Sequence, residues 1–369
     1  MSIYTIAEID LSILKNNMNV ISSITHGAKL LNVLKANAYG HGIIEIAKAS
    51  EKFKVDAIGV ATVEEGVKIR KSGIKVPIIV LFQHFKSEAE EVCKYNLTPI
   101  ISNDECLPYY EKYMERYRGS LKIHVYIKVD TGLNRMGAKP EEVLDLAKKV
   151  LSCKNLVLEG INTHFAAADM KDSAGKDFTR EQIKTFNEVI NNLKSNKIEV
   201  NTIHSANSAA ILSYEESFFD MVRAGITLYG YPPVNTNADI KPFMEVKSKV
   251  VLIKKLKKGE SVSYGMTWKA DKDTKIALIP IGYADGISRK LSNNWEVKIN
   301  NKYYPVRGRI CMDLTIVEIF KGNVNVEDDV LIFGNDKKLN AETMAKRIET
   351  IPHEVLVRIG ERVRRVYKD

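Results

Sequence analysis

The sequence is poor in cysteine. It has four cysteines among 369 residues, and no two of them form a C-x-x-C pair. This number is too small for a disulfide scaffold, so we expect a reduced, cytoplasmic protein in which the thiols serve as packing residues. The residues concerned are Cys93, Cys106, Cys153 and Cys311. No metal site is expected.

Long apolar runs are also absent. No stretch approaches the ~20 consecutive apolar residues that a membrane span requires, and the most apolar runs, such as residues 78–82, have the length of a strand. The N-terminal segment is interrupted by Glu8 and Asp10, which does not fit a secretory signal. We therefore expect neither a membrane segment nor a signal peptide.

The positive charge of the chain is dispersed. Lysine and arginine outnumber aspartate and glutamate by 55 to 46, a net charge of +9, but the basic residues are scattered, whereas a nucleic-acid binder concentrates them on one face. We expect no nucleic-acid partner, although the basic balance favours anionic small molecules. The densest run, residues 254–258, stands before Gly259 and is interpreted as a solvated turn.

The first two-thirds of the chain alternate between short β-rich runs and charged segments with helical spacing. The β-rich runs are residues 30–34, 57–61, 78–82, 97–101, 122–129, 157–162, 201–204 and 221–223. Helical spacing is clearest at residues 43–53, 63–72 and 179–194. About eight such units indicate an α/β fold, a (β/α)₈ barrel over residues 1–235. A doubly wound open sheet remains an alternative from the pattern alone.

A second domain is expected beyond a break at residues 231–239, which are rich in proline and asparagine and have no period. Short β-rich runs follow at residues 245–253, 275–280, 297–299, 315–319 and 330–333. Only residues 340–349 have helical spacing. We interpret residues 236–369 as a smaller, mostly antiparallel β domain.

Lys35 ends the first strand of the predicted barrel. Catalytic groups of barrels come from the carboxyl ends of the strands, and an ammonium group at the end of a buried apolar strand is costly to desolvate. One solution is a lowered pKa, and the resulting neutral amine can form a Schiff base with an aldehyde. The alternative is a lysine that extends to the surface. The residues alone leave both interpretations open.

Later strands deliver further polar residues to the same rim. Arg135 follows the strand at 122–129, His164 follows the strand at 157–162, residues 204–208 contain a histidine and two serines, and Arg223 ends the last strand. A single histidine or arginine would more often be structural, but four successive strands that end this way indicate a site. Ser208, with residues 225–226, lies late in the barrel, where backbone N–H groups commonly bind phosphate.

Seven short strings occur in register along the chain. They are VLKANAYGHG at 33–42, THFAAAD at 163–169, HSANSAA at 204–210, VRAGITLYG at 222–230, VSYGMTW at 262–268, GYADG at 282–286 and GRICMD at 308–313. Each resembles its counterpart in bacterial alanine racemases, which use pyridoxal 5'-phosphate. The resemblance extends over almost the whole chain. It implies an enzyme that interconverts L- and D-alanine and supplies D-alanine for peptidoglycan.

The resemblance also implies two catalytic bases, because inverting a stereocentre requires proton removal on one face and delivery on the other. Lys35 would hold pyridoxal phosphate as an internal aldimine and act as one base. Tyr264 would reach the site from the partner subunit of a homodimer and act as the other. A phenol is a weak base, which is a reason for His164 to connect Arg223 to Tyr264.

The remaining roles follow from the same resemblance. Arg223 would face the pyridine nitrogen of the cofactor, and Arg135 with the backbone of Met312 would position the substrate carboxylate. Lys128 matches a lysine that is often carbamylated in the family and supports Arg135. The phosphate would be bound by Tyr39, Ser208, Gly225 and Ile226.

The chain departs from the family pattern near its C-terminus. The family often has Arg-Val-Pro-Arg where residues 362–365 are Arg-Val-Arg-Arg, and Glu361 stands where some members place a phosphate-binding tyrosine. Tyr283 is interpreted either as lining the entrance or as a core residue of the β domain. His41 and His204 either support the site or are simply packed.

Three other functions are considered. A related racemase could act on serine, lysine or another amino acid, because motifs do not define pocket size. A non-catalytic pyridoxal-phosphate carrier would resemble the barrel half alone, and the β domain counts against it. A decarboxylase with a barrel and a β domain would need different substrate-binding loops, and nothing in the sequence supports it.

Overall fold

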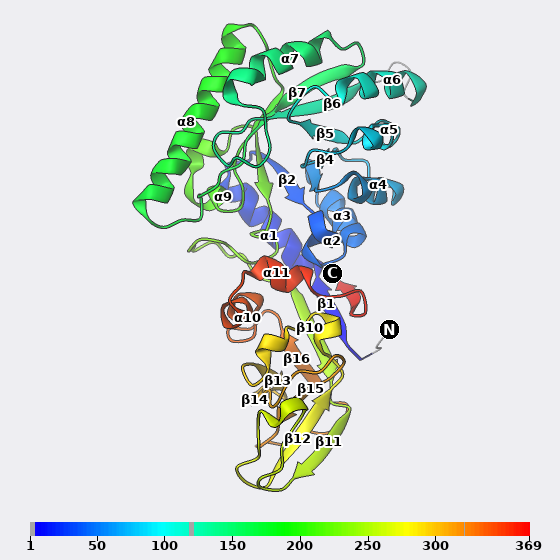
Figure 1. The fold of residues 1–369 in the computed structure, drawn as a ribbon, viewed down its shortest axis with the longest axis vertical. Coiled ribbons are helices and arrows are strands. Elements are labelled where there is room, and N and C mark those ends of the chain that lie inside the picture. The colour runs from blue at the N-terminus through cyan, green and yellow to red at the C-terminus, as the bar shows by residue number, and fades with distance from the viewer. Residues whose placement is uncertain (1–3, 118–121, 321) are drawn as a thin grey trace. The chain divides into compact units, whose positions relative to one another are not determined.

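The computed structural model describes residues 4–117, 122–320 and 322–369, and it divides into two compact units (Figure 1). The barrel unit comprises residues 15–38 and 43–240. The β unit comprises the N-terminal residues up to Leu14, residues 39–42 and residues 241–369. Each unit is built from segments that are distant in the chain.

Eight strands form a closed barrel in the order of the chain, and every neighbouring pair is parallel. They are β2 (Lys29–Val33), β3 (Ala57–Val60), β4 (Ile78–Val80), β5 (Thr98–Ile101), β6 (Ile123–Lys128), β7 (Leu156–Asn162), β8 (Thr202–His204) and β9 (Met221–Ala224). The predicted barrel is confirmed, and the open sheet was the wrong alternative. The strands are buried on both faces, which is why their sequences are nearly continuous apolar runs.

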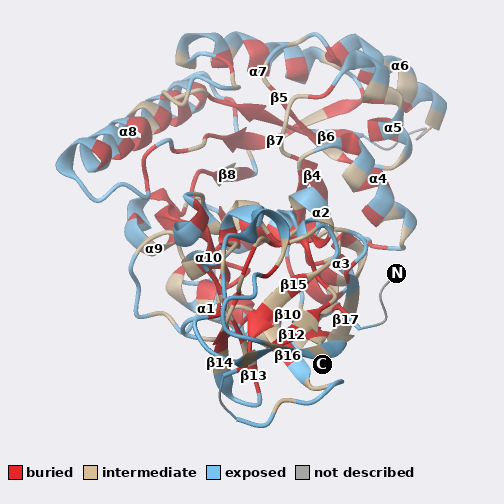
Figure 2. Ribbon diagram, turned by 60° about the horizontal axis from the view of Figure 1, so that its bottom comes forward, coloured by how far each residue is buried: buried red, intermediate tan, exposed pale blue. Residues whose placement is uncertain are grey.

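Helices cover the barrel and alternate with its strands. They are α1 (Leu11–Ile24), α3 (Ile43–Lys52), α4 (Val63–Lys71), α5 (Ala89–Lys94), α6 (Leu107–Tyr117), α7 (Val143–Ser152), α8 (Ser173–Ser195) and α9 (Ala210–Ser213). Figure 2 shows exposed outer faces on α7 and α8 and buried strands inside. Within the described residues, no helix combines the length and the apolarity needed to cross a bilayer.

The β unit contains two sheets. A six-stranded sheet has the order β14-β13-β16-β10-β1-β17, and a three-stranded sheet has the order β11-β12-β15. Its strands are β1 (Ile6–Asp10), β10 (Met244–Lys249), β11 (Leu252–Leu256), β12 (Thr274–Ile279), β13 (Glu296–Ile299), β14 (Lys302–Pro305), β15 (Thr315–Glu318), β16 (Asp329–Phe333) and β17 (Arg364–Lys368). Its helices are α10 (Ala341–Ile348) and α11 (Pro352–Val357). Most neighbours are antiparallel, as expected.

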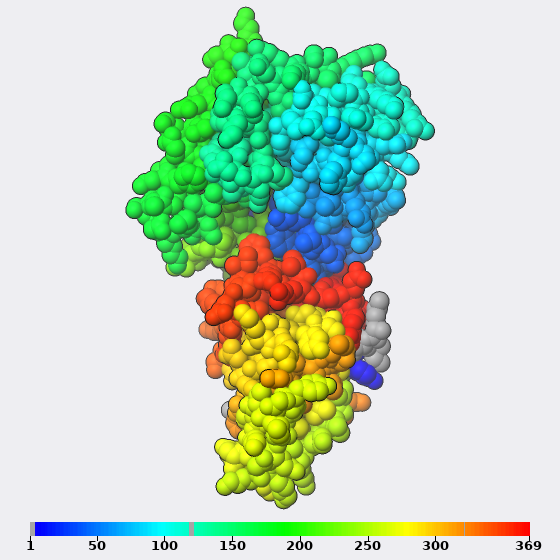
Figure 3. All heavy atoms as spheres, viewed as in Figure 1, coloured from blue at the N-terminus to red at the C-terminus, as the bar shows by residue number. Residues whose placement is uncertain are grey.

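The N-terminal strand belongs to the β unit and not to the barrel. β1 pairs antiparallel with β10 and parallel with β17 near the C-terminus. The all-atom view shows the deep blue start of the described chain beside the orange and yellow atoms of this unit (Figure 3). Our assignment of residues 1–235 to one domain is wrong for this strand, because pairing between strands so distant in the chain leaves no local pattern.

Three further details differ from the predictions. Residues 245–253 form parts of two strands in different sheets, because β10 ends at Lys249 before β11 begins. α11 was not predicted; it is short, and Pro352 occupies its first turn, where proline is well tolerated. The lysines at 254 and 255 lie on β11, an exposed edge strand and not a turn, and charged side chains protect such edges from further pairing.

The cysteines pack less uniformly than expected. Cys93 and Cys106 are buried, whereas Cys153 and Cys311 are partly exposed. All four are free thiols. The interpretation of all four as packing residues therefore holds for Cys93 and Cys106 only.

Residues 39–42 pack tightly within the β unit. Gly40 has a φ of 80°, and a Cβ atom at this position would collide with the carbonyl oxygen of Leu356. The Arg365 guanidinium donates to the carbonyls of Gly40 (3.0 Å), Val363 (2.7 Å) and residues 359 and 360 (2.5 Å each). In the segment that departs from the family pattern, residues 362–365, Arg365 therefore connects β17 to the turn at Gly40.

Replacing Gly40 by alanine is expected to destabilise the protein strongly. The variant combines a left-handed backbone with a collision against backbone atoms, and we expect a loss of about 3–5 kcal/mol in the free energy of unfolding, measured by urea titration. Gly259→Ala is the matched control: its φ is 88°, but nothing lies within 4 Å of the added atom, so about 1 kcal/mol should be lost. Equal losses in the two variants would contradict the steric argument.

Candidate functional site

Lys35 follows β2 and begins a left-handed turn. The residues labelled α2 (Lys35–Tyr39) have φ values of 52°, 55° and 53° at Ala36, Asn37 and Ala38, and Tyr39 has a φ of 50°. Residues other than glycine rarely adopt this conformation, which costs roughly 1–2 kcal/mol each. Such concentrated strain is characteristic of functional sites, where surrounding contacts hold it in place.

Glu65 is one of those contacts. One carboxylate oxygen accepts a hydrogen bond from the backbone N–H of Ala36 (2.7 Å), and the other accepts from the N–H of Ala61 (2.9 Å) and Thr62 (3.4 Å). The Thr62 side chain caps the start of α4 by accepting from the Glu65 N–H, so that Thr62 and Glu65 together form a capping box. Our sequence analysis missed Glu65, although the Thr-x-x-Glu pattern at 62–65 is a recognisable helix-start signal.

Replacing Glu65 by alanine should loosen the turn after Lys35. We expect a loss of about 2 kcal/mol of folding free energy, because charge-assisted hydrogen bonds to three backbone donors disappear. Glu64→Ala is the matched control, since this neighbour is exposed in the same helical turn and its removal should change stability by less than about 0.5 kcal/mol. Urea unfolding measures the stability of both variants. Equal losses would show that the Glu65 hydrogen bonds do not stabilise the turn.

Lys35 and Arg135 lie at the same end of the barrel. The Lys35 ammonium is 5.5 Å from the centroid of the Phe82 ring, and the Arg135 guanidinium is 5.7 Å from the same centroid. Burial lowers the pKa of Lys35 and the charge of Arg135 lowers it further, while Glu65 acts in the opposite direction. Of our two interpretations of Lys35, the structure thus favours a lysine with a lowered pKa over one that extends to the surface. Phe82 carried no signal in the sequence.

Arg223 on β9 is buried and held from several sides. Its guanidinium donates to the carbonyls of Thr163 and Ser205, both at 2.8 Å. It also contacts Nδ1 of His204 at 2.8 Å and Nδ1 of His164 at 3.1 Å. Burial lowers the pKa of Arg223 to about 10, so it remains charged at neutral pH. We predicted a link from Arg223 through His164 to Tyr264. Its first contact, between Arg223 and His164, is therefore present.

The contacts of Arg223 define the protonation of both histidines. Arginine can only donate hydrogen bonds, so Nδ1 of His164 and Nδ1 of His204 must accept, and the proton of each neutral ring lies on Nε2. Burial and the nearby positive charges hold the pKa of both imidazoles well below the usual range. Each histidine consequently presents an N–H donor on the side away from Arg223.

Ser208 organises the start of the segment after β9. Its hydroxyl oxygen accepts from the backbone N–H of Gly225 (3.0 Å) and Thr227 (3.2 Å), and the Thr227 hydroxyl donates to the Ser208 carbonyl (3.2 Å). Residues 225–230 form successive tight turns in which the N–H of Leu228 bonds back to Gly225. Ser208, Gly225 and Ile226 are thus adjacent and buried.

Lys128 ends β6 inside the barrel and is only 7% exposed. Burial holds its pKa well below the usual range, and the charges of Arg223 and Arg135 act in the same direction. A lowered pKa favours the neutral form of a buried amine, which is its nucleophilic form.

Tyr264 and Met312 lie on two connected loops of the β unit. The Ser263 hydroxyl donates to the Arg309 carbonyl (2.6 Å), and the N–H of Ala284 bonds to the Met312 carbonyl (3.0 Å). Ser263 has φ 63° and ψ −173°, a conformation found almost only in glycine. Tyr264, the next residue, is 70% exposed.

The other predicted residues of the β unit are packed or exposed as follows. Tyr39 is buried, and burial raises its pKa. His41 packs against Phe243 with ring centroids 4.6 Å apart and is a structural residue. Tyr283 is 44% exposed, so the core interpretation is wrong. Glu361 is exposed, and the neighbouring Arg362 pairs with Asp285 and Asp313.

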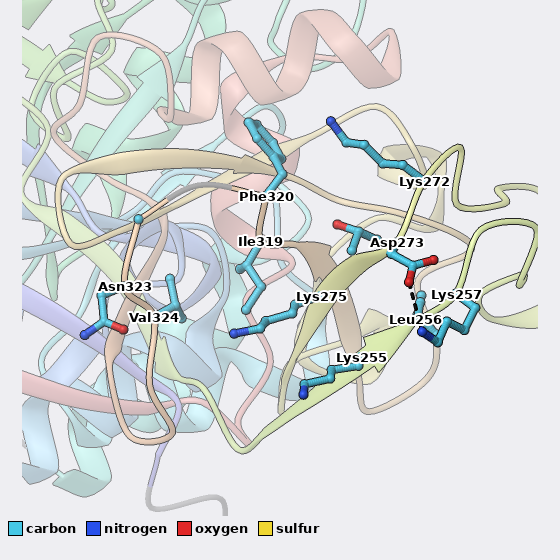
Figure 4. Close-up of a pocket in the computed structure, with 12 residues that line it drawn as sticks. Lys255, Leu256, Lys257, Lys272, Asp273, Lys275, Ile319, Phe320, Asn323 and Val324 are labelled. Atoms are coloured by element: carbon cyan, nitrogen blue, oxygen red, sulfur yellow. Dashed lines mark hydrogen bonds and ion pairs between the residues drawn. The ribbon is translucent and has the colours of Figure 1, made fainter.

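A separate groove of about 520 Å³ lies in the β unit and contains none of the predicted residues. Its lining includes Lys255, Lys257, Lys272 and Lys275, and the only ion pair drawn joins Lys257 to Asp273 (Figure 4). Solvated lysines on a sheet edge explain this composition. The chemistry described above is at the carboxyl ends of the barrel strands, where barrel enzymes carry their sites.

The closed parallel barrel, with polar and charged side chains after several of its strands, places the protein in the class of (β/α)₈ barrels that carry a site on the carboxyl rim of the sheet. Residues 9–233 match the alanine racemase N-terminal domain, and residues 243–367 match the alanine racemase C-terminal domain. The chain therefore belongs to the alanine racemase family, whose members are isomerases.

Similar proteins agree in sequence and in fold. The alanine racemase of Halothermothrix orenii is 39% identical over 372 residues, which cover 99% of this chain and 97% of that protein. A solved alanine racemase from Clostridium difficile 630 superposes with a TM-score of 0.92 at 35% identity, covering 100% of this chain and 96% of the other. The alanine racemase from Bacillus anthracis with bound L-Ala-P gives 0.90 at 29% identity, with the same coverage.

Proposed function

We propose that this protein interconverts L- and D-alanine with pyridoxal 5'-phosphate as its cofactor. The observation that carries the proposal is the position of Lys35. It follows strand β2 of the barrel, begins a strained turn held by Glu65, and has a lowered pKa beside Arg135. A lowered pKa favours the neutral amine that attacks an aldehyde, and the nearby Arg135 guanidinium suits an anionic group.

The residues present fit that cofactor. Lys35 would hold its aldehyde carbon. The Ser208 oxygen accepts from the N–H of Gly225 and Thr227, which leaves its own hydroxyl hydrogen to donate to a phosphate, and the adjacent Gly225 and Ile226 are two further proposed ligands. Tyr39 is the fourth proposed phosphate ligand. When bound, the cofactor supplies an electron sink for the bond to the α-hydrogen.

The protein's own residues then handle the proton and the carboxylate. Lys35 takes or returns a proton on one face of the α-carbon, and Tyr264 does so on the other. Arg135, with the backbone of Met312, binds the substrate carboxylate by charge-assisted hydrogen bonds. His164 receives a hydrogen bond from Arg223 at Nδ1, so its Nε2–H is the donor available to the Tyr264 phenol.

The exposed loops of the β unit support a homodimer with shared sites. Tyr264, Met266, Tyr283 and Met312 are 70%, 64%, 44% and 52% exposed, although large apolar side chains are usually covered. They lie on the loops that Ser263, Arg309 and Cys311 connect. We propose that a second copy of the chain covers this surface and receives Tyr264 in its own site.

Lys128 is the proposed site of carbamylation. Its lowered pKa favours the neutral amine, and conversion to a carbamate would place a negative charge beside Arg135 and support it. The four free thiols fit action in the reducing cytoplasm. There the D-alanine product would serve peptidoglycan synthesis.

A panel assay tests the proposed reaction. Purified protein is incubated in D₂O with L-alanine, L-serine and L-lysine, and both the α-hydrogen exchange and the enantiomer ratio are followed. We expect alanine to reach a nearly equal mixture of enantiomers fastest. Serine or lysine as the best substrate would replace the alanine assignment with another racemase, and no exchange with any of them would refute racemisation.

The pH dependence of cofactor loading tests the environment of Lys35. Only the neutral amine attacks an aldehyde, and its pKa is lowered, so the loading rate of the apoprotein should rise with pH and level off below the ordinary lysine value of 10.5. Arg135→Gln should move the midpoint upward, and Glu65→Gln should move it downward. The absorbance of bound pyridoxal phosphate reports the rate. Shifts in the same direction would contradict the charge assignment.

A further inference from the structure

Gln182 is a buried polar side chain on α8 whose hydrogen bonds reach two separate loops. It is only 1% exposed. Its Nε2 donates to the Thr131 hydroxyl (3.2 Å) and to the His164 carbonyl (3.3 Å), and its Oε1 accepts from the Ala166 N–H (3.0 Å). One amide therefore connects the loop after β6 that leads to Arg135 (residues 130–135, the Arg135 loop) with the loop after β7 (residues 163–166, the His164 loop).

The direction of every hydrogen bond in this network is defined. A backbone N–H can only donate and a carbonyl can only accept, so the amide of Gln182 has one possible orientation. The Thr163 hydroxyl donates its single proton to the Val129 carbonyl (2.9 Å), and it must therefore accept at its 2.8 Å contact with the Thr131 hydroxyl. Thr131 in turn accepts from Gln182. The network thus has a single arrangement and not several equivalent ones.

The backbone of the His164 loop depends on this amide. Among the residues described, no other hydrogen bond reaches the His164 carbonyl or the Ala166 N–H. The imidazole of His164 is held separately, because Arg223 donates to its Nδ1 at 3.1 Å. His164 is therefore fixed at two places, by Arg223 through the ring and by Gln182 through the main chain.

The Arg135 loop rests on the same face of α8. Gly132 has a φ of 133°, and a Cβ atom at this position would lie 3.0 Å from the Phe178 ring and 3.8 Å from the Gln182 side chain. Phe178 and Gln182 are one helical turn apart and so lie on one face of the helix. The carboxylate of Asp130 accepts from two N–H groups of the loop at 3.1 and 3.0 Å. Those bonds are internal to the loop, whereas Gln182 joins it to another element.

We propose that Gln182 is a positioning residue that holds the Arg135 and His164 loops in one fixed arrangement. An apolar side chain of similar length would fill this position without the cost of desolvating an amide, so the network points to a role in geometry. The inference rests on the proposed function, in which Arg135 binds the substrate carboxylate and Nε2–H of His164 faces the Tyr264 phenol. The hydrogen bonds of Gln182 go to backbone groups and one hydroxyl, and it acts through these two loops.

Two measurements on the holoenzyme test the two loops without turnover. Propionate has the carboxylate of alanine but no amino group, and its affinity, measured by calorimetry, reports on Arg135. The pH titration of the His164 ring, followed by NMR of protein labelled with ¹⁵N-histidine and assigned with His164→Gln, reports on the other loop. Gln182→Met removes the amide at similar length, and Gln182→Leu is a second variant without it.

Both readouts should change in the Gln182 variants. We expect propionate to bind about tenfold more weakly, because a displaced guanidinium loses well-aligned charge-assisted hydrogen bonds. The pKa of His164 is held well below its ordinary value of 6.5 by burial, and it should rise toward that value when the loop is no longer fixed. Glu181→Met is the matched control. Glu181 is the preceding residue and is exposed, so its replacement should change neither readout.

Thr131→Val separates the two loops. The substitution removes the hydroxyl at similar size but leaves both backbone hydrogen bonds of Gln182 in place. We expect propionate to bind about fivefold more weakly, which corresponds to the loss of one net hydrogen bond. The titration of His164 should equal that of the wild type.

Urea unfolding shows which Gln182 variants are folded, and either one suffices. If a folded variant keeps the wild-type value of either readout, one amide does not fix both loops and the inference is overturned. Wild-type propionate affinity in Thr131→Val would overturn it as well. A wild type that does not bind propionate would overturn it together with the proposed role of Arg135. A wild type that binds propionate but does not racemise alanine would refute the proposed reaction alone.

Discussion

Racemisation by the Lys35→Ala variant is expected to fall by at least about 10³-fold, since a positioned base alone contributes roughly 10²–10⁴. The substitution also removes the amine that would hold the cofactor aldehyde. Two measurements check this expectation. Exchange of the alanine α-hydrogen with D₂O should nearly stop, and borohydride should fix pyridoxal phosphate to the Lys35 peptide of the wild type, as seen by mass spectrometry, but not to the variant.

Lys29→Ala provides the control on the same strand. Lys29 begins β2 and is exposed, whereas Lys35 follows the other end of that strand. The control should retain both exchange and borohydride fixation, and an added primary amine should restore part of the exchange in Lys35→Ala. Undiminished exchange in Lys35→Ala, or fixation at another lysine, would refute the assignment of this site.

Mixing Lys35→Ala chains with Tyr264→Phe chains is expected to restore activity that neither variant has alone. If Lys35 of one chain works with Tyr264 of the partner subunit, each mixed dimer has one intact site of two. Random exchange places half of the chains in mixed dimers, so about one quarter of the wild-type activity should return. Tyr264→Phe alone should lose about 10²–10⁴ in racemisation while still exchanging the α-hydrogen of one enantiomer.

The control for this experiment is a mixture of two variants with the same defect. Tagged and untagged Lys35→Ala chains, when mixed, should exchange partners but regain no racemase activity. Chain exchange is verified by co-purification of a tagged with an untagged chain. Confirmed exchange without recovery in the Lys35→Ala and Tyr264→Phe mixture would show that each site is complete within one chain.

The barrel could be predicted because its strands and helices have strong local signals. β6 and β7 are buried on both faces and read as apolar runs, whereas α8 shows the helical period of a half-buried helix. Lys35 could be predicted as a site residue for the same reason, since its charge directly follows an apolar strand. The resemblance of the short motifs then extended the set of predicted site residues to others such as Tyr264, which periodicity alone does not select.

The sequence by itself therefore determined the alternation of about eight strands with helices, the change to a β-rich second part, and the residues at the carboxyl ends of the barrel strands. Only the tertiary structure decided that β1 pairs with β10 and β17, that Glu65 holds the turn after Lys35, and that Asn162 lies between Lys128 and His204. The physical reason is distance along the chain. Periodicity reports the faces of one element, whereas these contacts join residues from separate elements whose register is set by closure of the sheet.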